Sequence, residues 1–373
     1  MGQGEAKNRA WAEIDLAALR RNYRWLKSRA GGRELIAVVK ADAYGHGAVP
    51  VARSLAEEGA GMLAVVTPGE ARQLREAGID SAILLLGPLL DAAEVESCLA
   101  LDLDLAATRL EALELYAAGA RRSGRPARVH LKLDTGMGRV GLAPDEVQRA
   151  VAILRQSPSR EPVGLMTHLA EADDARSPRT ELQRRRLGEA LALLRDGGLE
   201  PRWIHCDNSA GIARGCWPDA SAVRPGIALY GAQPTLERGL PLEPVMSLWA
   251  RVCHAKTVPA GATVGYGGEY RAEGPTHIVT AALGYADGFP RAASGFRLGA
   301  AGARLPLAGR VSCDLICAEA EGAGVEVGDP LLVFGRDSGR SIPVEQLADA
   351  AGTISYEILT RIGARVPRGY SGG

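Results

Sequence analysis

Eight short apolar segments recur between residues 34 and 231, separated by stretches of helical character. The stretches between them, such as AVPVARSLAEEGA at 48–60, place apolar residues three and four positions apart, as amphipathic helices do. Eight such units predict a (β/α)8 barrel of the TIM type. An open doubly wound sheet is the alternative, but the first strand-to-helix turn lacks its GxGxxG motif. The eight predicted strands are ELIAVVK from residue 34, GMLAVV from 61, SAILLLG from 81, LDLDLAA from 101, ARVHLKLD from 127, VGLMTHL from 163, WIHCDNS from 203 and AVRPGIALYG from 222.

The texture of the chain changes near residue 240. Valine-rich pieces broken by glycine and proline follow, such as THIVTAALGYADG from residue 276 and DPLLVFG from residue 329, with a short helical stretch at IPVEQLADAAG. This pattern predicts a barrel domain at 1–240 and a mainly-β domain at 241–373. The N-terminal strand at about 9–15 is expected to be able to pair with the second domain, because a predicted helix separates it from the first barrel strand.

Composition narrows the classes of partner. Acidic and basic residues balance at 44 each, so neither nucleic acid nor a membrane surface is expected as a partner. No apolar stretch has the length of a signal peptide core or of a membrane span, and we expect a cytoplasmic protein. The six cysteines include no CxxC pair, which favours reduced thiols, and no metal site is predicted.

One lysine stands at the end of an apolar strand. The chain has five lysines among its 44 basic residues, and Lys40 follows the run from Leu35 to Val39. Polar residues at the C-terminal ends of barrel strands line the active site. Apolar surroundings lower the pKa of a lysine and supply the neutral amine that attacks an aldehyde. The alternatives are a solvent-exposed lysine and an ion pair with Asp42.

Other polar residues gather at the same end of the predicted barrel. The hydroxyl of Ser209 and the backbone N–H groups of Gly226 and Ile227 favour a phosphate site after strands seven and eight, although an ordinary tight turn would have the same sequence. An amine for an aldehyde beside a phosphate site indicates pyridoxal 5'-phosphate as the cofactor. The strand-end residues are Lys132 and Asp134 on strand five, His168 on strand six, His205, Asn208 and Ser209 on strand seven, and Arg224 in strand eight.

Eight motifs, in this order, resemble the alanine racemase family over nearly the whole chain. The resemblance implies a pyridoxal phosphate enzyme, a barrel followed by a β domain, that interconverts the L and D forms of a small amino acid, alanine. It also implies a head-to-tail homodimer with shared active sites. The motifs, which match the family in order and spacing, are AVVKADAYGHG, HLKLDTGMGRVG, THLAEAD, HCDNSAG, VRPGIALYG, VGYGGEY, LGYADGFPR and GRVSCD.

The resemblance assigns two acid/base residues. Lys40 would hold the cofactor as a Schiff base and act as one of them, and Tyr266, delivered from the partner subunit, would be the other. Racemisation removes the α-proton from one face and returns it to the opposite face, so one base on each face suits the reaction. Without the resemblance, Tyr266 would read as an aromatic residue in a β-domain core.

Further residues receive roles around the cofactor ring. Arg224 would face the pyridine nitrogen, to which a guanidinium can donate without protonating it; a salt bridge to an acidic neighbour is the alternative. Arg139 would contact the cofactor's phenolic oxygen or the substrate carboxylate. Lys132 matches a lysine that some members carry as a carbamate, and its alternative is an ion pair with Asp134. His168 would lie near the substrate entry of the cofactor site and His205 beside Arg224. For both, our interpretation is a hydrogen-bonded barrel histidine that takes no part in catalytic proton transfer.

The remaining matches concern the phosphate and the substrate. Cys313 stands where the family usually has methionine, and its backbone N–H is expected to meet the substrate carboxylate. A shorter side chain there predicts modestly relaxed specificity. Racemases of serine, lysine or broader range stay open as alternatives, as do a decarboxylase of the same fold and a pyridoxal phosphate carrier. Tyr44, Tyr356 and Asn208 match the phosphate side of the cofactor site, and Tyr285, Arg291, Arg310, Asp173, Cys313 and Asp314 match the substrate side.

Overall fold

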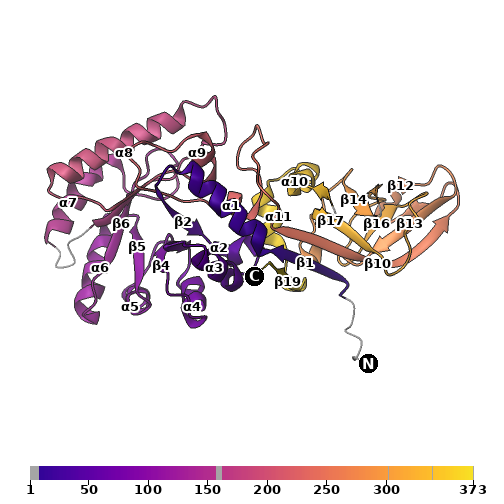
Figure 1. Cartoon of the computed structure of the whole chain (residues 1–373), viewed down its shortest axis with the longest axis horizontal. Helices are drawn as coiled ribbons and strands as arrows, with labels where there is room; N and C mark the ends of the chain where they lie inside the picture. The colour runs from indigo at the N-terminus through magenta and orange to yellow at the C-terminus, as the bar shows by residue number, and fades with distance from the viewer. Residues whose placement is uncertain (1–7, 157–161, 301, 338, 373) are drawn as a thin grey trace.

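The computed structural model describes residues 8–156, 162–300, 302–337 and 339–372. Its N-terminal part is a barrel of eight parallel strands, which confirms the predicted fold class (Figure 1). Along the sheet the order is β8-β7-β6-β5-β4-β3-β2-β9. The strands are β2 (Glu34–Val38), β3 (Met62–Val65), β4 (Ala82–Leu85), β5 (Leu103–Ala107), β6 (Arg128–Lys132), β7 (Pro162–Met166), β8 (Trp203–His205) and β9 (Ala222–Val223).

Backbone hydrogen bonds bring the two ends of this sheet together. Ser221 donates its N–H to the carbonyl of Ile204 at 2.9 Å, and Arg224 donates to the carbonyl of Asp207 at 2.8 Å. These bonds join the chain around β8 to the chain around β9, so the barrel is nearly closed. The alternative of an open doubly wound sheet is therefore wrong.

Helices surround the barrel strands (Figure 1). In α3, for example, Val51, Ala52 and Leu55 are buried. The helix α4 begins with Pro68 after a capping box, in which the Thr67 side chain and the Glu70 side chain each accept a backbone N–H. The 3-10 turn η1 (Pro144–Glu146) precedes α7, and the 3-10 turn η2 (Ile227–Tyr230) follows β9. The helices are α1 (Leu16–Arg29), α3 (Ala48–Glu57), α4 (Pro68–Glu76), α5 (Ala92–Ala100), α6 (Leu110–Ser123), α7 (Val147–Gln156), α8 (Arg179–Asp196) and α9 (Ser209–Arg214).

The turn after β2 winds in the left-handed sense. In α2 (Lys40–Gly45), residues 41–44 all have φ between 52° and 53°, which costs L-residues about 1–2 kcal/mol each. Side-chain carboxylates hold this turn: Glu70 accepts the N–H of Ala41 at 2.7 Å, and Asp42 accepts the N–H of Ala48 at 2.7 Å. The strained turn directly follows Lys40 and fixes the path of the chain there.

The C-terminal part is mainly β, as predicted. A nine-stranded sheet has the path β15-β14-β17-β10-β1-β19, with β13 pairing β10 and β16, and β18 pairing β17. Its elements after β9 are β10 (Met246–Val258), β11 (Thr263–Val264), η3 (Tyr266–Gly268), β12 (Tyr270–Arg271), β13 (Thr276–Ala281), η4 (Tyr285–Asp287), β14 (Arg297–Ala300), β15 (Ala303–Pro306), β16 (Ile316–Glu319), β17 (Pro330–Asp337), β18 (Arg340–Ile342), α10 (Val344–Ala351), α11 (Ser355–Arg361) and β19 (Arg368–Ser371); β11 and β12 form a separate ribbon.

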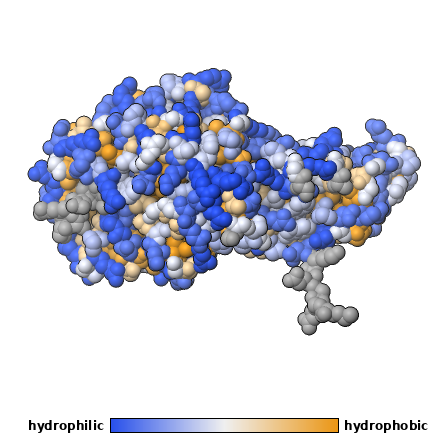
Figure 2. Space-filling model, in the orientation of Figure 1, coloured by the Kyte–Doolittle hydropathy of each residue, from blue (hydrophilic) through white to orange (hydrophobic). Residues whose placement is uncertain are grey.

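The N-terminal strand β1 (Ala10–Asp15) belongs to this second sheet. It pairs antiparallel with β10 and parallel with β19, so the first and the last described strands lie side by side in this sheet. The domain boundary near residue 240 stays a prediction. Figure 2 shows hydrophilic residues over most of one face of both parts, with apolar residues in small patches. Within the described ranges, no helix combines the length and the apolar character needed to span a membrane.

Candidate active site

A cavity of about 480 Å³ lies at the C-terminal ends of the barrel strands. Its apolar wall includes Val38, Val66, Leu86 and Met166. Every barrel residue that the sequence predicted for the cofactor borders this one space. These residues are Lys40, Tyr44, Lys132, Arg139, His168, Asn208, Ser209, Arg224, Gly226 and Ile227, joined by Tyr356 from α11 of the β domain.

Positive charge dominates the cavity. Lys40, Lys132, Arg139 and Arg224 line it, and no aspartate or glutamate is among its described lining residues. Burial, followed by the charge of Arg139, lowers the pKa of Lys40. Burial, followed by the charges of Arg224 and Arg139, lowers the pKa of Lys132 to about 8. Such a cavity suits an anionic ligand and holds part of its amines uncharged.

The nearby carboxylates are engaged elsewhere. Asp42 accepts the N–H of Ala48, and Asp134 accepts the backbone N–H groups of Gly136 and Gly138, each at 3.0 Å. The structure therefore does not support the alternatives in which Lys40 or Lys132 is simply the ion-pair partner of a neighbouring aspartate.

Arg224 is buried and held by neutral acceptors. Its Nη1 lies 2.7 Å from both Nδ1 and the carbonyl oxygen of His205, and its Nη2 donates to the carbonyl of Thr167 at 2.6 Å. Burial lowers the pKa of Arg224 to about 10, so the group stays charged at neutral pH. The salt bridge considered as an alternative for this arginine is not what holds it.

A chain of buried polar groups extends behind Arg224. Because a guanidinium only donates, Nδ1 of His205 accepts, and its Nε2 carries the proton toward Nδ1 of His130, 2.8 Å away. His130 Nε2 then donates to Asp104 at 3.2 Å, and Asp104 also accepts from Arg128. Burial and then the charge of Arg224 lower the pKa of His205 well below its ordinary value, so His205 is neutral, and its hydrogen bonds to Arg224 and His130 fix its tautomer.

His130 and Asp104 were not predicted from the sequence as site residues. Their signal was present: His130 precedes Lys132 by two positions, so on a strand both side chains point to the same side. His168 also faces this cluster, with Nδ1 3.4 Å from Arg224 Nη2. Burial and the surrounding cations lower the pKa of His168 to about 3, which makes it neutral as well.

The opposite end of the cavity is built from hydroxyl and backbone groups. Ser209 Oγ accepts the N–H of Gly226 at 2.9 Å and that of Ala228 at 3.2 Å. The N–H of Gly226 is therefore committed to Ser209, whereas that of Ile227 has no partner among the described residues. A Cβ at Gly226 would lie 2.7 Å from the Tyr44 hydroxyl oxygen, so glycine keeps this space open.

Two tyrosines complete this end. The rings of Tyr44 and Tyr356 lie 6.2 Å apart. Burial raises the pKa of Tyr44, and burial followed by the charge of Asp173 raises that of Tyr356 to about 12. Both hydroxyls are thus neutral donors. Hydroxyl donors and a free backbone N–H around an open space fit the chemistry of a phosphate group.

The predicted residues of the β domain do not line this cavity. Tyr266, on η3, is 70% exposed, and Tyr285, on η4, is 47% exposed. Cys313 lies close to Tyr285, whose pKa it raises. Arg310 pairs with Glu269, and Asp314 pairs with Arg365 at 2.8 Å. Within one chain, the structure brings together the predicted barrel residues and Tyr356, but it leaves Tyr266, Tyr285, Cys313, Asp314, Arg291, Arg310 and Asp173 outside the cavity.

A barrel with a cationic, lysine-bearing cavity and a following β domain defines a class of two-domain enzyme. The family model "Alanine racemase, N-terminal domain" matches residues 14–234, and "Alanine racemase, C-terminal domain" matches residues 245–370. The chain belongs to the alanine racemase family.

Full-length relatives and solved structures agree. The alanine racemase of Desulforamulus reducens is 40% identical over 98% of this chain and 100% of its own length, and that of Streptomyces coelicolor is 42% identical over 98% and 97%. The crystal structure of alanine racemase from a D-cycloserine-producing Streptomyces lavendulae superposes with a TM-score of 0.93 at 40% identity, covering 99% of this chain and 98% of that one. The biosynthetic alanine racemase of Pseudomonas aeruginosa gives 0.87 at 37%, covering 98% and 99%.

Proposed function

We propose that the protein interconverts L-alanine and D-alanine with pyridoxal 5'-phosphate bound at Lys40. The observation that carries this proposal is the grouping of three further basic side chains, two tyrosine hydroxyls and a serine hydroxyl around Lys40 at the end of a barrel of this family. The cofactor's phosphate would lie against Ser209 and the N–H of Ile227. Arg224, on the buried side, would meet its ring nitrogen.

The cofactor and the protein divide the chemistry. Pyridoxal phosphate, when bound, supplies an electron sink that acidifies the α-carbon of an amino acid attached to it. Lys40 holds the proton on one face of that carbon. Since burial and Arg139 lower the pKa of Lys40, its amine gives up a proton more readily than an exposed lysine and can take one from the α-carbon in the reverse direction.

Arg224 donates a hydrogen bond and keeps its own proton. Its guanidinium is fixed by His205 and by backbone carbonyls, and its pKa of about 10 remains above neutrality. Arg224 would therefore leave the ring nitrogen of a bound cofactor unprotonated, and the weaker withdrawal of electron density would favour return of the proton to the α-carbon over competing reactions. This supports a racemase over the decarboxylase considered as an alternative.

Arg139 and Lys132 would act on the substrate side of the cavity. We propose that Arg139 binds the substrate carboxylate or the cofactor's phenolic oxygen. The pKa of about 8 at Lys132 leaves part of this amine unprotonated, which is the form that carbon dioxide can carbamylate. A carbamate there would turn a cation into an anion and would orient the Arg139 guanidinium.

The second base would come from another copy of the chain. Tyr266 is exposed and lies outside the cavity of its own chain, together with Tyr285, Cys313 and Asp314, for which we propose substrate contacts. A head-to-tail homodimer would bring Tyr266 of one subunit to Lys40 of the other. Each site would then have one proton carrier on each face of the α-carbon.

The test is to incubate the purified protein with pyridoxal phosphate and L-alanine in deuterated water and to separate the products by chiral chromatography. We expect D-alanine that carries deuterium at the α-carbon, and a Lys40→Ala protein should produce none. A protein that binds the cofactor yet leaves L-alanine unchanged would contradict alanine as the substrate, and serine and lysine would be tested next.

A further inference from the structure

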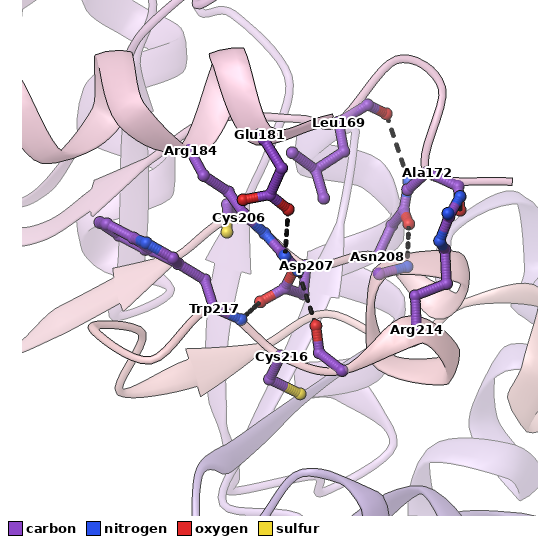
Figure 3. Close-up of polar contacts among 12 residues, drawn as sticks. Leu169, Ala172, Glu181, Arg184, Cys206, Asp207, Asn208, Arg214, Cys216 and Trp217 are labelled. Atoms are coloured by element: carbon purple, nitrogen blue, oxygen red, sulfur yellow. Dashed lines mark hydrogen bonds and ion pairs between the residues drawn. The ribbon is translucent and has the colours of Figure 1, made fainter. Parts of the chain in front are cut away.

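A buried ion pair lies behind the phosphate end of the cavity. Arg184, on α8, places Nη2 2.7 Å from Oδ1 of Asp207, which follows β8 (Figure 3). Asp207 is completely buried and the Arg184 side chain is only 11% exposed. Neither residue lines the cavity, so the proposed function gives this pair no direct contact with the cofactor.

The pair closes the segment that contains α9. The second carboxylate oxygen of Asp207 accepts the N–H of Trp217 at 2.9 Å, and Arg184 Nη2 also donates to the carbonyl of Gly215 at 2.7 Å (Figure 3). These contacts thereby hold the beginning and the end of the segment 207–217 close together. The carbonyl of Asp207 accepts the N–H of Arg224, which links the same point to β9.

The positions of the phosphate-end residues follow from this anchor. Asn208 and Ser209 come directly after Asp207, and Asn208 Oδ1 accepts the N–H of Gly211 at 3.0 Å. A Cβ at Gly211 would lie 2.7 Å from Asp207 Oδ1, so the carboxylate packs directly against the first turn of α9. A shift of Asp207 would therefore move Ser209, whose hydroxyl accepts the N–H groups of Gly226 and Ala228.

We propose that the Arg184–Asp207 pair positions Ser209 and the adjoining backbone for the cofactor's phosphate, an inference that rests on the proposed function. Both are positioning residues, because they act through Asn208 and Ser209. A buried charge is tolerated only beside an opposite charge or hydrogen-bond partners, and removal of one member of an ion pair leaves the charge of the other member uncompensated. The segment 207–217 would then relax away from its place at the phosphate end, while the lysine end of the cavity would keep its geometry.

The test compares the affinity of the cofactor-free protein for pyridoxal phosphate with its affinity for pyridoxal, which lacks the phosphate, by absorbance titration. Asp207→Asn keeps the shape and the acceptor for Trp217 but removes the counter-charge of Arg184. We expect the preference for the phosphorylated compound to fall about 10-fold, as is usual when a group that orients a ligand is lost, with the affinity for pyridoxal unchanged.

Two further variants keep the test decisive. Asp207→Asn combined with Arg184→Gln removes both charges and avoids an unpaired buried arginine, and the same loss of preference is expected. Glu181→Gln is the matched control, because Glu181 is the exposed second partner of Arg184 at 3.0 Å, and the preference should stay at the wild-type value.

Equal losses of affinity for both compounds, or an unchanged preference in the variants, would overturn the positioning role. A wild-type protein with no preference for pyridoxal phosphate over pyridoxal would instead overturn the proposed phosphate site, and this inference with it. The wild-type titration thus separates the two failures.

Discussion

Among single residues, Asp104 accepts the last hydrogen bond in the chain of polar groups that begins at Arg224, and it therefore fixes the direction of the hydrogen bonds along that chain. It is the only carboxylate in the sequence of contacts from Arg224 through His205 and His130. Burial acts to raise its pKa, but hydrogen bonds from His130 and Arg128 and the charge of Arg128 outweigh burial, and the pKa lies below its ordinary value. The carboxylate therefore stabilises the folded protein while it is ionised.

The first prediction concerns this carboxylate. A depressed pKa in the folded state gives stability that is complete above the unfolded pKa of about 3.9 and is lost as the pH falls through the folded value. Asp104→Asn should lower the free energy of unfolding at pH 7 by about 2 kcal/mol, below the range for fully buried pairs because Arg128 is partly exposed. Urea unfolding of the cofactor-free protein at pH 7 and at about pH 3, below the unfolded pKa, measures it, and the difference from wild type should shrink at the lower pH.

Asp102→Asn serves as the control for this prediction. Asp102 is the other carboxylate partner of Arg128, and its side chain is 72% exposed. Its replacement should change the free energy of unfolding by less than about 1 kcal/mol. Equal effects of the two substitutions would show that burial of Asp104 has no special weight.

The second prediction concerns Cys313, which lies near Tyr285 at the proposed substrate side. Cysteine is shorter than the methionine usual in the family, so Cys313→Met should narrow the pocket. We expect the ratio of kcat/KM for alanine to that for serine to rise about 10-fold or less, the range set by one methylene group. An unchanged ratio would refute the idea that this wall sets specificity.

Turning to elements, the left-handed turn at residues 41–44 stores strain beside Lys40. Ala41 is exposed and has φ of 52°, a conformation that glycine adopts without cost. The third prediction is that Ala41→Gly raises the free energy of unfolding of the cofactor-free protein by about 1 kcal/mol. The same substitution at Ala152, exposed on the regular helix α7, should lower it by about 1 kcal/mol.

Urea unfolding of both variants beside wild type checks this pair. If both glycines destabilise the protein equally, the left-handed turn carries no strain that glycine relieves. The opposite signs expected here depend only on backbone conformation, because neither alanine side chain is buried.

The elements were readable from the sequence where the signal is local. The eight apolar runs predicted the eight barrel strands, and the positions of Lys40 and Arg224 at strand ends predicted the cavity. The left-handed turn was not readable, because it contains no glycine before Gly45 and depends on Glu70, which is distant in sequence. The contact of Arg184 with Asp207 could not be predicted for a similar reason. Arg184 lies in a run of three arginines that resembles a solvent-exposed helix face, and only the packing of α8 shows which of the three contacts the buried Asp207.

The polar chain behind Arg224 was also beyond the sequence. Each histidine lies on a separate strand, and the contact between His130 and His205 joins positions 75 residues apart. It requires β6, β7 and β8 to take one particular register, which apolar patterning alone does not specify. Strand-end chemistry is therefore easier to predict than contacts across the barrel interior.

For the whole molecule, the exposed Tyr266 lies outside the cavity of its own chain, so the pair of bases that we propose is incomplete within one chain. The fourth prediction is that Lys40→Ala and Tyr266→Ala proteins, each inactive, regain activity when mixed under conditions of subunit exchange. Random pairing should restore roughly a quarter of wild-type activity, because half of the dimers are mixed and each holds one intact site. Racemase activity against mixing time measures the recovery.

The control mixes Lys40→Ala with a protein that carries both substitutions, since no pairing of these chains forms an intact site. Recovery in the control would indicate contamination or an activity that does not need Lys40. No recovery in the main experiment, with exchange shown by mixed dimers, would rule out shared active sites.

The strand β1 lies between β10 and β19 in the sheet of the β domain. During synthesis β1 leaves the ribosome before any of the barrel, yet its two neighbours are made after the barrel, and β19 is made after every other described strand. The order in which this chain is made is thus not the order in which it can be completed. The strand β1 cannot pair until β10 and β19 have been made, so in a nascent chain released early both edges of β1 are unpaired.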